Sequence, residues 1–275
     1  MIQNINFDDT TFICYCGKYD WLMPLFSSMF NRMWNKNIPI YVVSHIDCDV
    51  TDWPDNFKLI KVNSSNFSHA ILEFYDKGFC KDKIFWMTED LIMYDKVDYE
   101  YLKKGITYFD EDERLLKFSL HFYPGNQNEL TPSPNPVGAN NIITQYSHDN
   151  DFVQWNFGYP CFAIAFYKTL QFYESLVRIK DYYNEINNTT LFSPHQWEKY
   201  PWHTPRHKDF IRESTLVCKK KVIYPCVDFV RSDAQINKIG KYHWRKWEAF
   251  NIPEEISILF NEYCIRYENY IFGKD

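Results

Sequence analysis

The sequence predicts an α/β fold, in which a mostly parallel central sheet is flanked by helices within a single domain. Over the first hundred residues, short apolar runs typical of buried strands alternate with segments whose apolar residues have helical spacing. This alternation favours parallel strands, because each one needs a crossover connection. The length of 275 residues suits one such domain, and neither an internal repeat nor a linker divides the chain.

The first hundred residues contain four expected strands and two expected helices. The first strand, over 11–16, ends at Gly17, and the helix over 21–30 has Asp20 as a possible N-cap. The remaining elements are strands over 38–43, 57–62 and 83–87, with a helix over 68–77 that ends at Gly78.

The rest of the chain carries weaker structural signals. Residues 123–141 are rich in Pro, Asn and Gly, which predicts a long loop of the kind that often serves as a functional lid. We expect a helix over 161–179, a late strand over 222–227 and an amphipathic C-terminal helix over 256–272.

Composition argues against several kinds of partner. A net charge of −6 does not favour nucleic acid or an anionic membrane, since both require a basic surface. No run of 18 apolar residues occurs, so no membrane span is expected, and residues 1–10 lack the features of a signal peptide. The aromatic fraction of 19% favours either a site for flat ligands such as sugars and nucleobases or an aromatic-rich core.

The eight cysteines do not form a recognisable framework. Cys14 and Cys16 are two residues apart on an expected strand, so both should point to the same buried face. No second Cys/His pair has zinc-site spacing, so no zinc site is expected, and a reducing compartment fits this usage.

Two adjacent carboxylates are the strongest local feature. Ligands of open α/β sheets bind at the carboxyl ends of the strands, which makes residues 15–20, 44–47 and 88–90 the first candidates. Glu89 and Asp90 lie between apolar runs, where two acids are costly unless positive charge meets them. A divalent cation that carries a diphosphate would supply it. The alternative is one solvated acid followed by a helix N-cap.

The segment over 85–98, FWMTEDLIMYDKVD, resembles the D-x-D stretch of GT-A glycosyltransferases. Thr88, Glu89 and Asp90 fall on the three motif positions, with Thr88 in place of the first Asp. An x-E-D version of this motif is associated with a group of bacterial and viral GT-A proteins. The resemblance implies that Asp90 holds a divalent cation, Mn²⁺ or Mg²⁺, and that Thr88 and Glu89 contact the donor.

Two later segments resemble other parts of the same group. The sequence SPHQWE over 193–198, preceded by 158–168, resembles its acceptor side, which implies Glu198 as general base and Trp197 and Tyr159 as acceptor contacts. Glu198 could instead be an acid at a helix N-terminus and Trp197 a core residue. The sequence IGKYHW over 239–244 resembles a late G-K-x segment, implying a metal contact for His243 and a donor contact for Lys241, or else a surface turn.

Residues after the first two expected strands are candidates for contacts with the nucleotide. Tyr15 and Asp20 could meet the base and ribose, and Ser44 and Asp47 lie where a uracil or ribose is usually recognised. Arg114 could pair either with a phosphate or with the acidic run just before it.

Taken together, the resemblance implies a single catalytic domain over 1–275 that moves a sugar from a nucleotide-diphosphate donor to an acceptor hydroxyl with inversion. Residues 1–100 would form the nucleotide-binding half and 101–275 the acceptor-binding half, in the cytoplasm of a bacterium or of a virus-infected host cell. A non-catalytic nucleotide- or carbohydrate-binding protein is the alternative from another class. A sugar nucleotidyltransferase is disfavoured, because residues 16–20 lack a Gly-rich basic loop.

Overall fold

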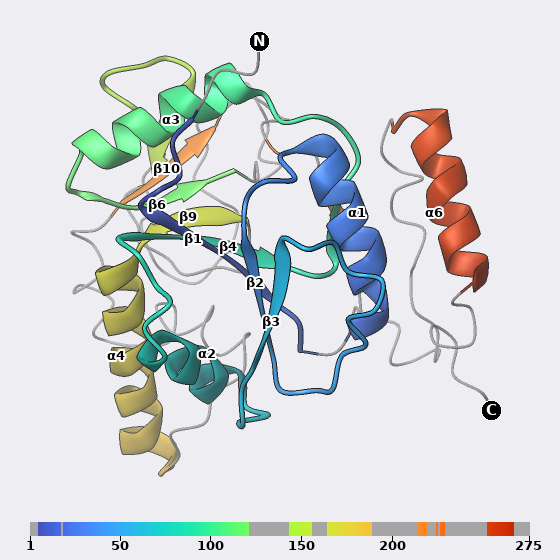
Figure 1. Cartoon of the computed structure of the whole chain (residues 1–275). Coiled ribbons are helices and arrows are strands. Elements are labelled where there is room, and N and C mark those ends of the chain that lie inside the picture. The colour runs from blue at the N-terminus through green and yellow to red at the C-terminus, as the bar shows by residue number, and fades with distance from the viewer. Residues whose placement is uncertain are drawn as a thin grey trace, which may run out of the picture.

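The computed structural model describes residues 5–17, 19–120, 143–155, 164–188, 214–218, 224, 226–228 and 252–266. Within them, the main sheet has nine strands in the order β3-β2-β1-β4-β9-β6-β10-β8-β7 (Figure 1). The strands are β1 Thr10–Tyr15, β2 Ile40–Ser44, β3 Phe57–Lys61, β4 Lys83–Thr88, β6 Leu115–Ser119, β7 Ile143–Gln145, β8 Phe152–Trp155, β9 Ala165–Lys168 and β10 Ser214–Cys218.

Most strands of this sheet run in one direction. The strands β3, β2, β1 and β4 are successive parallel neighbours. Strand β9 is antiparallel to both β4 and β6, so β6 again runs with β4, and β10 is parallel to β6. Strand β8 is the other reversed member, paired antiparallel with β10 and β7. The prediction of a mostly parallel sheet flanked by helices is therefore confirmed.

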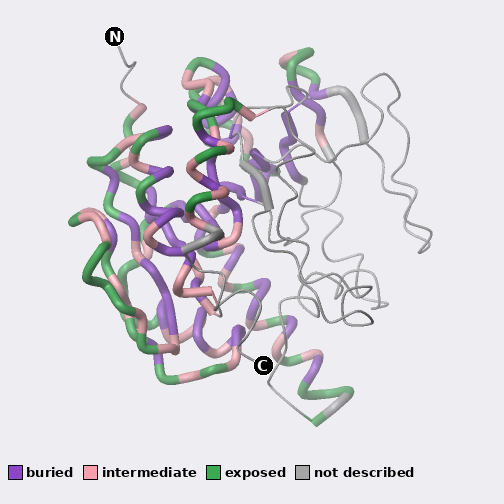
Figure 2. The backbone as a smooth tube through the Cα atoms, turned by 90° about the vertical axis from the view of Figure 1, so that its right-hand side faces the viewer, coloured by how far each residue is buried: buried purple, intermediate pink, exposed green. Residues whose placement is uncertain are grey.

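Helices cover both faces of the sheet, giving three layers (Figure 1). The helices α1 Met23–Met33 and α3 Tyr99–Glu111 pack on one face, with α6 Glu254–Arg266 on the same side beyond α1 (Figure 1). The helices α2 Phe67–Asp76 and α4 Thr169–Asn187 pack on the other face. Alternate residues of β1 point to opposite layers, with Phe12, Cys14 and Cys16 on the α1 side and Ile13 on the α2 side. Figure 2 shows buried residues concentrated along the sheet and on the inward sides of the helices. The predicted common buried face of Cys14 and Cys16 is confirmed.

A second, two-stranded sheet extends the carboxyl end of β4. Strand β5 Leu91–Met93 begins one turn after β4, lies against α1 and pairs antiparallel with β11 Cys226–Asp228. Glu89 and Asp90 thus form a turn between two buried strands.

Local signals explain where two helices begin and end. The Asn66 side chain caps α2 by accepting hydrogen bonds from the Ser68 and His69 backbone N–H groups, and Gly78, just beyond the helix, has a φ of 75°. The expected N-cap at Asp20 is wrong. Asp20 begins a 3₁₀ turn, η1 Asp20–Leu22, and α1 follows it with Leu22 as its N-cap and Pro24 in its first turn.

In the second half of the chain, the observed elements differ more from those expected from the sequence. The helix expected over 161–179 is wrong at its start, since β9 occupies 165–168 and α4 begins only at Thr169. The expected loop over 123–141 lies outside the described residues, as does the end of the helix expected over 256–272. Half of the strand expected over 222–227 is described, and its last two residues belong to β11. No helix among the described residues is long and apolar enough to cross a membrane.

Candidate functional site

The order of the first four strands reverses between β1 and β4. Strands β1, β2 and β3 run outward along one side of the sheet, and the chain then returns to place β4 on the other side of β1. Tyr15 and Thr88, the last residues of β1 and β4, are direct partners in the parallel register. Such a reversal opens a crevice at the carboxyl ends of the two strands, which is where open α/β sheets bind ligands. The segments over 15–20 and 88–90 are therefore brought together as predicted.

Glu89 joins the two segments at this edge. It is buried, at 5% exposure, and its Oε1 accepts a hydrogen bond from the Tyr19 backbone N–H at 3.2 Å. The carboxylate thus fixes the loop after β1 against the turn after β4. Asp90, the next residue, is partly exposed at the same edge.

Tyr15, the last residue of β1, packs on the α2 side of the sheet. Its ring lies parallel to that of Trp86, with centroids 6.3 Å apart, and edge-on to that of Phe67 at 5.2 Å. A Cβ at Gly17 would lie 2.7 Å from Cε1 of Tyr15, so the close approach of backbone to ring requires glycine there. Burial, assisted by the negative charge of Glu89, raises the pKa of Tyr15 to about 12, which keeps the phenol neutral.

The negative charge at this edge affects the pKa of Cys14. Burial raises the pKa of this thiol well above its usual value, and the charges of Glu89 and Asp90 raise it further. The negative charges of Glu89 and Asp90 therefore disfavour a further negative charge at this point of the sheet. A diphosphate bound at this edge would meet the same negative charges, which a bound cation would offset.

The end of β2 supplies a polar loop beside the crevice. Ser44 is fully buried, and its Oγ accepts a hydrogen bond from the Ile46 N–H at 3.2 Å. Cys48 Sγ lies 3.4 Å from the same oxygen. Asp47 is exposed and pairs with Lys61 Nζ at 2.5 Å, and this ammonium group holds the pKa of Asp47 below its usual value. The hydroxyl of Ser44 thus orders the loop, while the donor contacts predicted for Ser44 and Asp47 stay predictions.

The turn η1 is anchored from the C-terminal side of the chain. The hydroxyl of Tyr263 on α6 donates a hydrogen bond to the Trp21 carbonyl, and the Trp21 ring stands edge-on to that of Tyr19, with centroids 6.2 Å apart. Asp20 is partly exposed between these two aromatic residues in sequence. A helix more than 240 positions away therefore supports the loop that carries Asp20.

The described residues contain no group of three or more His, Cys, Asp and Glu side chains placed to hold a metal ion. A complete protein cage is not needed for a cation that bridges phosphates, since Mg²⁺ in such sites takes one or two carboxylates and keeps phosphate and water oxygens. Asp90, with its hard carboxylate oxygens at an open edge, fits that arrangement.

One candidate, Arg114, does not lie at this edge. Arg114 binds Asp112 through two hydrogen bonds, Nε to Oδ1 at 2.9 Å and Nη2 to Oδ2 at 2.7 Å, just before β6 and hence at the amino edge of the sheet. Arg114 was expected to pair either with a phosphate or with the acidic run before it, and the structure shows the pairing with the acidic run. Five predicted residues lie outside the described part of the chain, namely Tyr159, Trp197, Glu198, Lys241 and His243.

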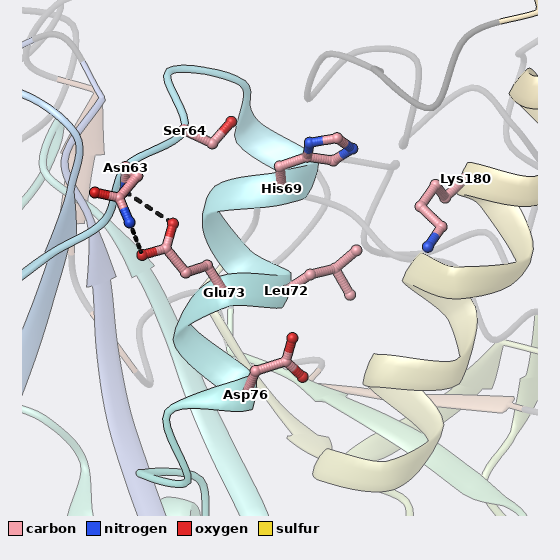
Figure 3. A pocket seen from close by; sticks show the side chains of 7 residues that line it. All are labelled: Asn63, Ser64, His69, Leu72, Glu73, Asp76 and Lys180. Atoms are coloured by element: carbon pink, nitrogen blue, oxygen red, sulfur yellow. Dashed lines mark hydrogen bonds between the residues drawn. The ribbon is translucent and has the colours of Figure 1, made fainter.

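Three hollows lined by described residues lie away from the crevice. Figure 3 shows one of about 440 Å³ between α2 and α4, where Glu73 holds Asn63 by two hydrogen bonds and Lys180 extends from α4 toward α2. The others lie at the start of α4, around Lys83 and Lys168, and along α3, around Lys104 and Tyr108. None is lined by a predicted site residue.

Comparisons with known proteins give a distant likeness of fold. No protein-family model matches the sequence, and no curated protein matches it. The mannosyltransferase PcManGT from Pyrobaculum calidifontis, solved in complex with GDP-Man and Mn²⁺, is similar with a TM-score of 0.45 and 13% identity over 96% of this chain and 72% of that one. The galactosyltransferase LgtC, solved with donor and acceptor sugar analogues, has a TM-score of 0.44 and 8% identity over 92% and 95%. The mannosyltransferase Ktr4p from S. cerevisiae has a TM-score of 0.28 and 12% identity over 42% and 40%. All three are glycosyltransferases, and at these values the likeness concerns the fold alone.

Proposed function

We propose that this protein is a glycosyltransferase that uses a nucleotide-diphosphate sugar, bound at the carboxyl ends of β1 and β4. The observation that carries the proposal is the placement of Glu89 and Asp90 at the point where the strand order reverses, opposite the end of β1. The segment that carries them is also the one that resembles the D-x-D stretch of GT-A glycosyltransferases.

Within this site each described residue has a definite task. Asp90 would hold Mn²⁺ or Mg²⁺, and the bound cation would offset the charge of the diphosphate as it leaves. Glu89 holds the loop after β1, and Tyr15 presents a rigid, neutral ring beside it. Asp20 and Asp47, which follow the ends of β1 and β2, would contact the hydroxyl groups of a ribose.

The acceptor side is proposed from the sequence resemblance. Glu198 would deprotonate the attacking hydroxyl on the face opposite the leaving diphosphate, which gives inversion in a single displacement. Trp197 and Tyr159 would contact the acceptor, His243 and Lys241 the metal and the diphosphate. In this proposal the first hundred residues bind the nucleotide and the remainder binds the acceptor.

A substitution at Asp90 tests the cation site. We expect Asp90→Ala to lose most of the Mn²⁺-dependent thermal stabilisation by a nucleoside diphosphate, because the carboxylate that positions the cation is removed. A tenfold loss of affinity corresponds to about 1.4 kcal/mol of binding free energy. The measurement is a thermal-shift titration of nucleoside diphosphates and nucleotide sugars, with and without Mn²⁺.

Asp82→Ala is the matched control for that experiment. Asp82 is an exposed carboxylate just before β4, at the opposite end of the same strand, and its removal changes the net charge equally. We expect its nucleotide titrations to match those of the wild type. If Asp90→Ala also matches the wild type, the cation does not bind at this carboxylate.

Turnover separates an enzyme from a binding protein. We expect Glu198→Gln to retain donor binding and lose sugar transfer by at least about 100-fold, because a general base typically contributes 10²–10⁴-fold to the rate. Donor hydrolysis and transfer by the wild type and the variant are the measurements. Full activity of the variant would rule out Glu198 as the base, and nucleotide binding without hydrolysis or transfer by the wild type would indicate a binding protein.

A further inference from the structure

Two thiols meet at the carboxyl edge of the sheet. Cys16 directly follows β1, where its backbone N–H donates to the Val43 carbonyl of β2 at 3.0 Å. Cys48 lies four residues beyond the end of β2 and packs against the same core cluster that holds Cys16. Cys16 follows Tyr15, the parallel partner of Val43, and therefore lies beside Ser44, whose Oγ is 3.4 Å from Cys48 Sγ. The two thiols are thus close neighbours on the same side of the sheet edge.

The two thiols differ in accessibility. Cys16 is fully buried, whereas Cys48 is partly exposed in the loop after β2. Among the described residues, the other cysteine of intermediate burial is Cys80, and burial raises its pKa to about 12. The pair thus combines a thiol that solvent can reach with a buried thiol directly behind it.

The surroundings of Cys48 favour its thiolate. The hydrogen bond from Cys16 lowers the pKa of Cys48 to about 7, against the effect of burial, and the contact with Ser44 and the charge of Lys61 act in the same direction. Asp20 opposes them. Conversely, the same contact with Cys48, together with burial and the charge of Glu89, raises the pKa of Cys16. A thiol with a pKa near ambient pH is the most effective attacking group in disulfide exchange.

We propose that Cys16 and Cys48 form a thiol–disulfide exchange site, which a low-molecular-weight disulfide such as oxidised glutathione closes into a Cys16–Cys48 disulfide. This site is independent of the proposed transferase activity, because it follows from the placement of the two thiols around Ser44.

The chemistry proceeds in two exchanges. The Cys48 thiolate attacks one sulfur of oxidised glutathione, which forms a mixed disulfide and releases one glutathione thiolate. Cys16 then loses its proton to solvent and attacks the Cys48 sulfur, which forms the internal disulfide and releases the second glutathione. Two protein thiols are oxidised while one glutathione disulfide is reduced to two thiols, and added reduced glutathione reverses both steps.

The bond would join two segments that are otherwise held only by hydrogen bonds and packing. It would tie the residue after β1 to the loop that follows β2, and both segments border the crevice at the carboxyl edge. Cross-linking residues 32 positions apart restricts the unfolded chain, so the oxidised protein is expected to be more stable than the reduced one.

Peptide mapping after equilibration in glutathione buffers of increasing oxidising power tests the proposal. Free thiols are blocked by alkylation, and the chain is digested with trypsin, which places Cys16 in peptide 1–18 and Cys48 in peptide 37–58. We expect these two peptides to be linked in the oxidised wild type, with the link lost in both Cys16→Ser and Cys48→Ser. Cys80→Ser is the matched control and should keep it.

A thermal measurement supplies the second readout. The oxidised wild type should melt about 5 °C or more above the reduced protein, and Cys48→Ser should show no such difference. Because Cys48 is partly exposed, this variant keeps the test open if Cys16→Ser does not fold. The proposal is overturned if the linked peptides are absent at every glutathione ratio, or if the link persists in Cys16→Ser, which would assign it to Cys14. Neither result depends on nucleotide binding, so failure here and failure of the transferase proposal are distinguishable.

Discussion

At the scale of single residues, Glu89 and Asp90 separate into two tasks that the sequence left together. Glu89 is turned inward onto the Tyr19 N–H, while Asp90 remains partly exposed at the edge. Sequence alone identified the pair, because two acids between apolar runs are unusual. It could not distinguish the two side chains, since their orientation depends on a loop 70 positions earlier in the chain.

Removing the Glu89 carboxylate should loosen the loop after β1. We expect Glu89→Ala to lower the free energy of unfolding by about 1.5–3 kcal/mol, because a hydrogen bond to a charged group is lost in a buried setting. Glu89→Gln keeps an oxygen acceptor of nearly the same shape and should lose less. Urea denaturation of the two variants checks this. Equal losses in both would mean that the charge, rather than the acceptor, is what matters at this position.

The cysteines show what residue spacing can and cannot reveal. Cys14 and Cys16 could be placed on one buried face from their spacing of two on a strand, and the structure confirms this. The contact of Cys16 with Cys48 was missed. Its signal was the position of Cys48 just past the end of a neighbouring parallel strand, where carboxyl ends converge.

At the scale of elements, the sequence pattern was sufficient to place the strands and helices of the first hundred residues. Later in the chain the pattern is weaker, and helices and strands were missed or misplaced. The expected strands and helices up to β4 match the observed ones within about three residues. Helix α3 was missed, although its buried residues have helical spacing and Asp98 caps it by accepting from the Tyr101 N–H. Gly105 in its middle and its many tyrosines lower helix propensity. Strand β9 was merged with α4, because so short an apolar segment does not distinguish a strand from a helix.

Gly105 also provides a test of how α3 packs on β6. A Cβ built there would lie 2.1 Å from Cζ of Phe118, a fully buried residue of β6. Alanine improves helix propensity by about 1 kcal/mol, but overpacking a core costs about 1–3 kcal/mol, and an overlap this severe puts the cost at the upper end. We therefore expect Gly105→Ala to destabilise the protein by about 1–2 kcal/mol in urea denaturation.

A second substitution at the same contact isolates the cause. Phe118→Leu removes the ring atoms that the new methyl group would meet, so Gly105→Ala should cost less in that background than in the wild type. The double-mutant cycle measures this difference. Additive effects would show that the cost of Gly105→Ala arises within the helix rather than at its contact with β6.

At the scale of the whole molecule, the parallel half of the sheet could be predicted and its continuation could not. Alternating strands and helices imply crossovers, and crossovers imply parallel neighbours. No sequence pattern indicates that β9 inserts antiparallel between β4 and β6. The β4–β9 pairing joins residues 79 to 85 positions apart and has no short turn to mark it. The proposed site is divided in the same way. Its described half comes from consecutive early strands, which the sequence pattern predicts, and its predicted acceptor half comes from later segments of the sequence.

Three wholly or partly buried tyrosines give the molecule a stability that should decline in alkali. The pKa values of Tyr15, Tyr99 and Tyr146 are each raised from 10.0 to about 12, chiefly by burial. Between these values the folded chain keeps phenolic protons that the unfolded chain has released, so the stabilisation is complete below pH 10 and is lost as the pH rises toward 12. Lys83, whose pKa its ion pairs with Asp110 and Asp9 raise despite burial, acts in the same direction.

Urea denaturation at a series of pH values from 8 to 11.5 measures this decline. We expect each raised tyrosine to contribute on the order of 1 kcal/mol of the loss by the upper limit, after allowance for partial exposure. Tyr99→Phe provides the comparison. It removes one titrating phenol and the hydrogen bond of that phenol to the Trp34 carbonyl at 2.8 Å, so the variant should be less stable at pH 8 and fall less steeply above pH 10. Parallel declines in the two proteins would show that Tyr99 titrates normally in the folded chain and that burial at this position does not hold its proton.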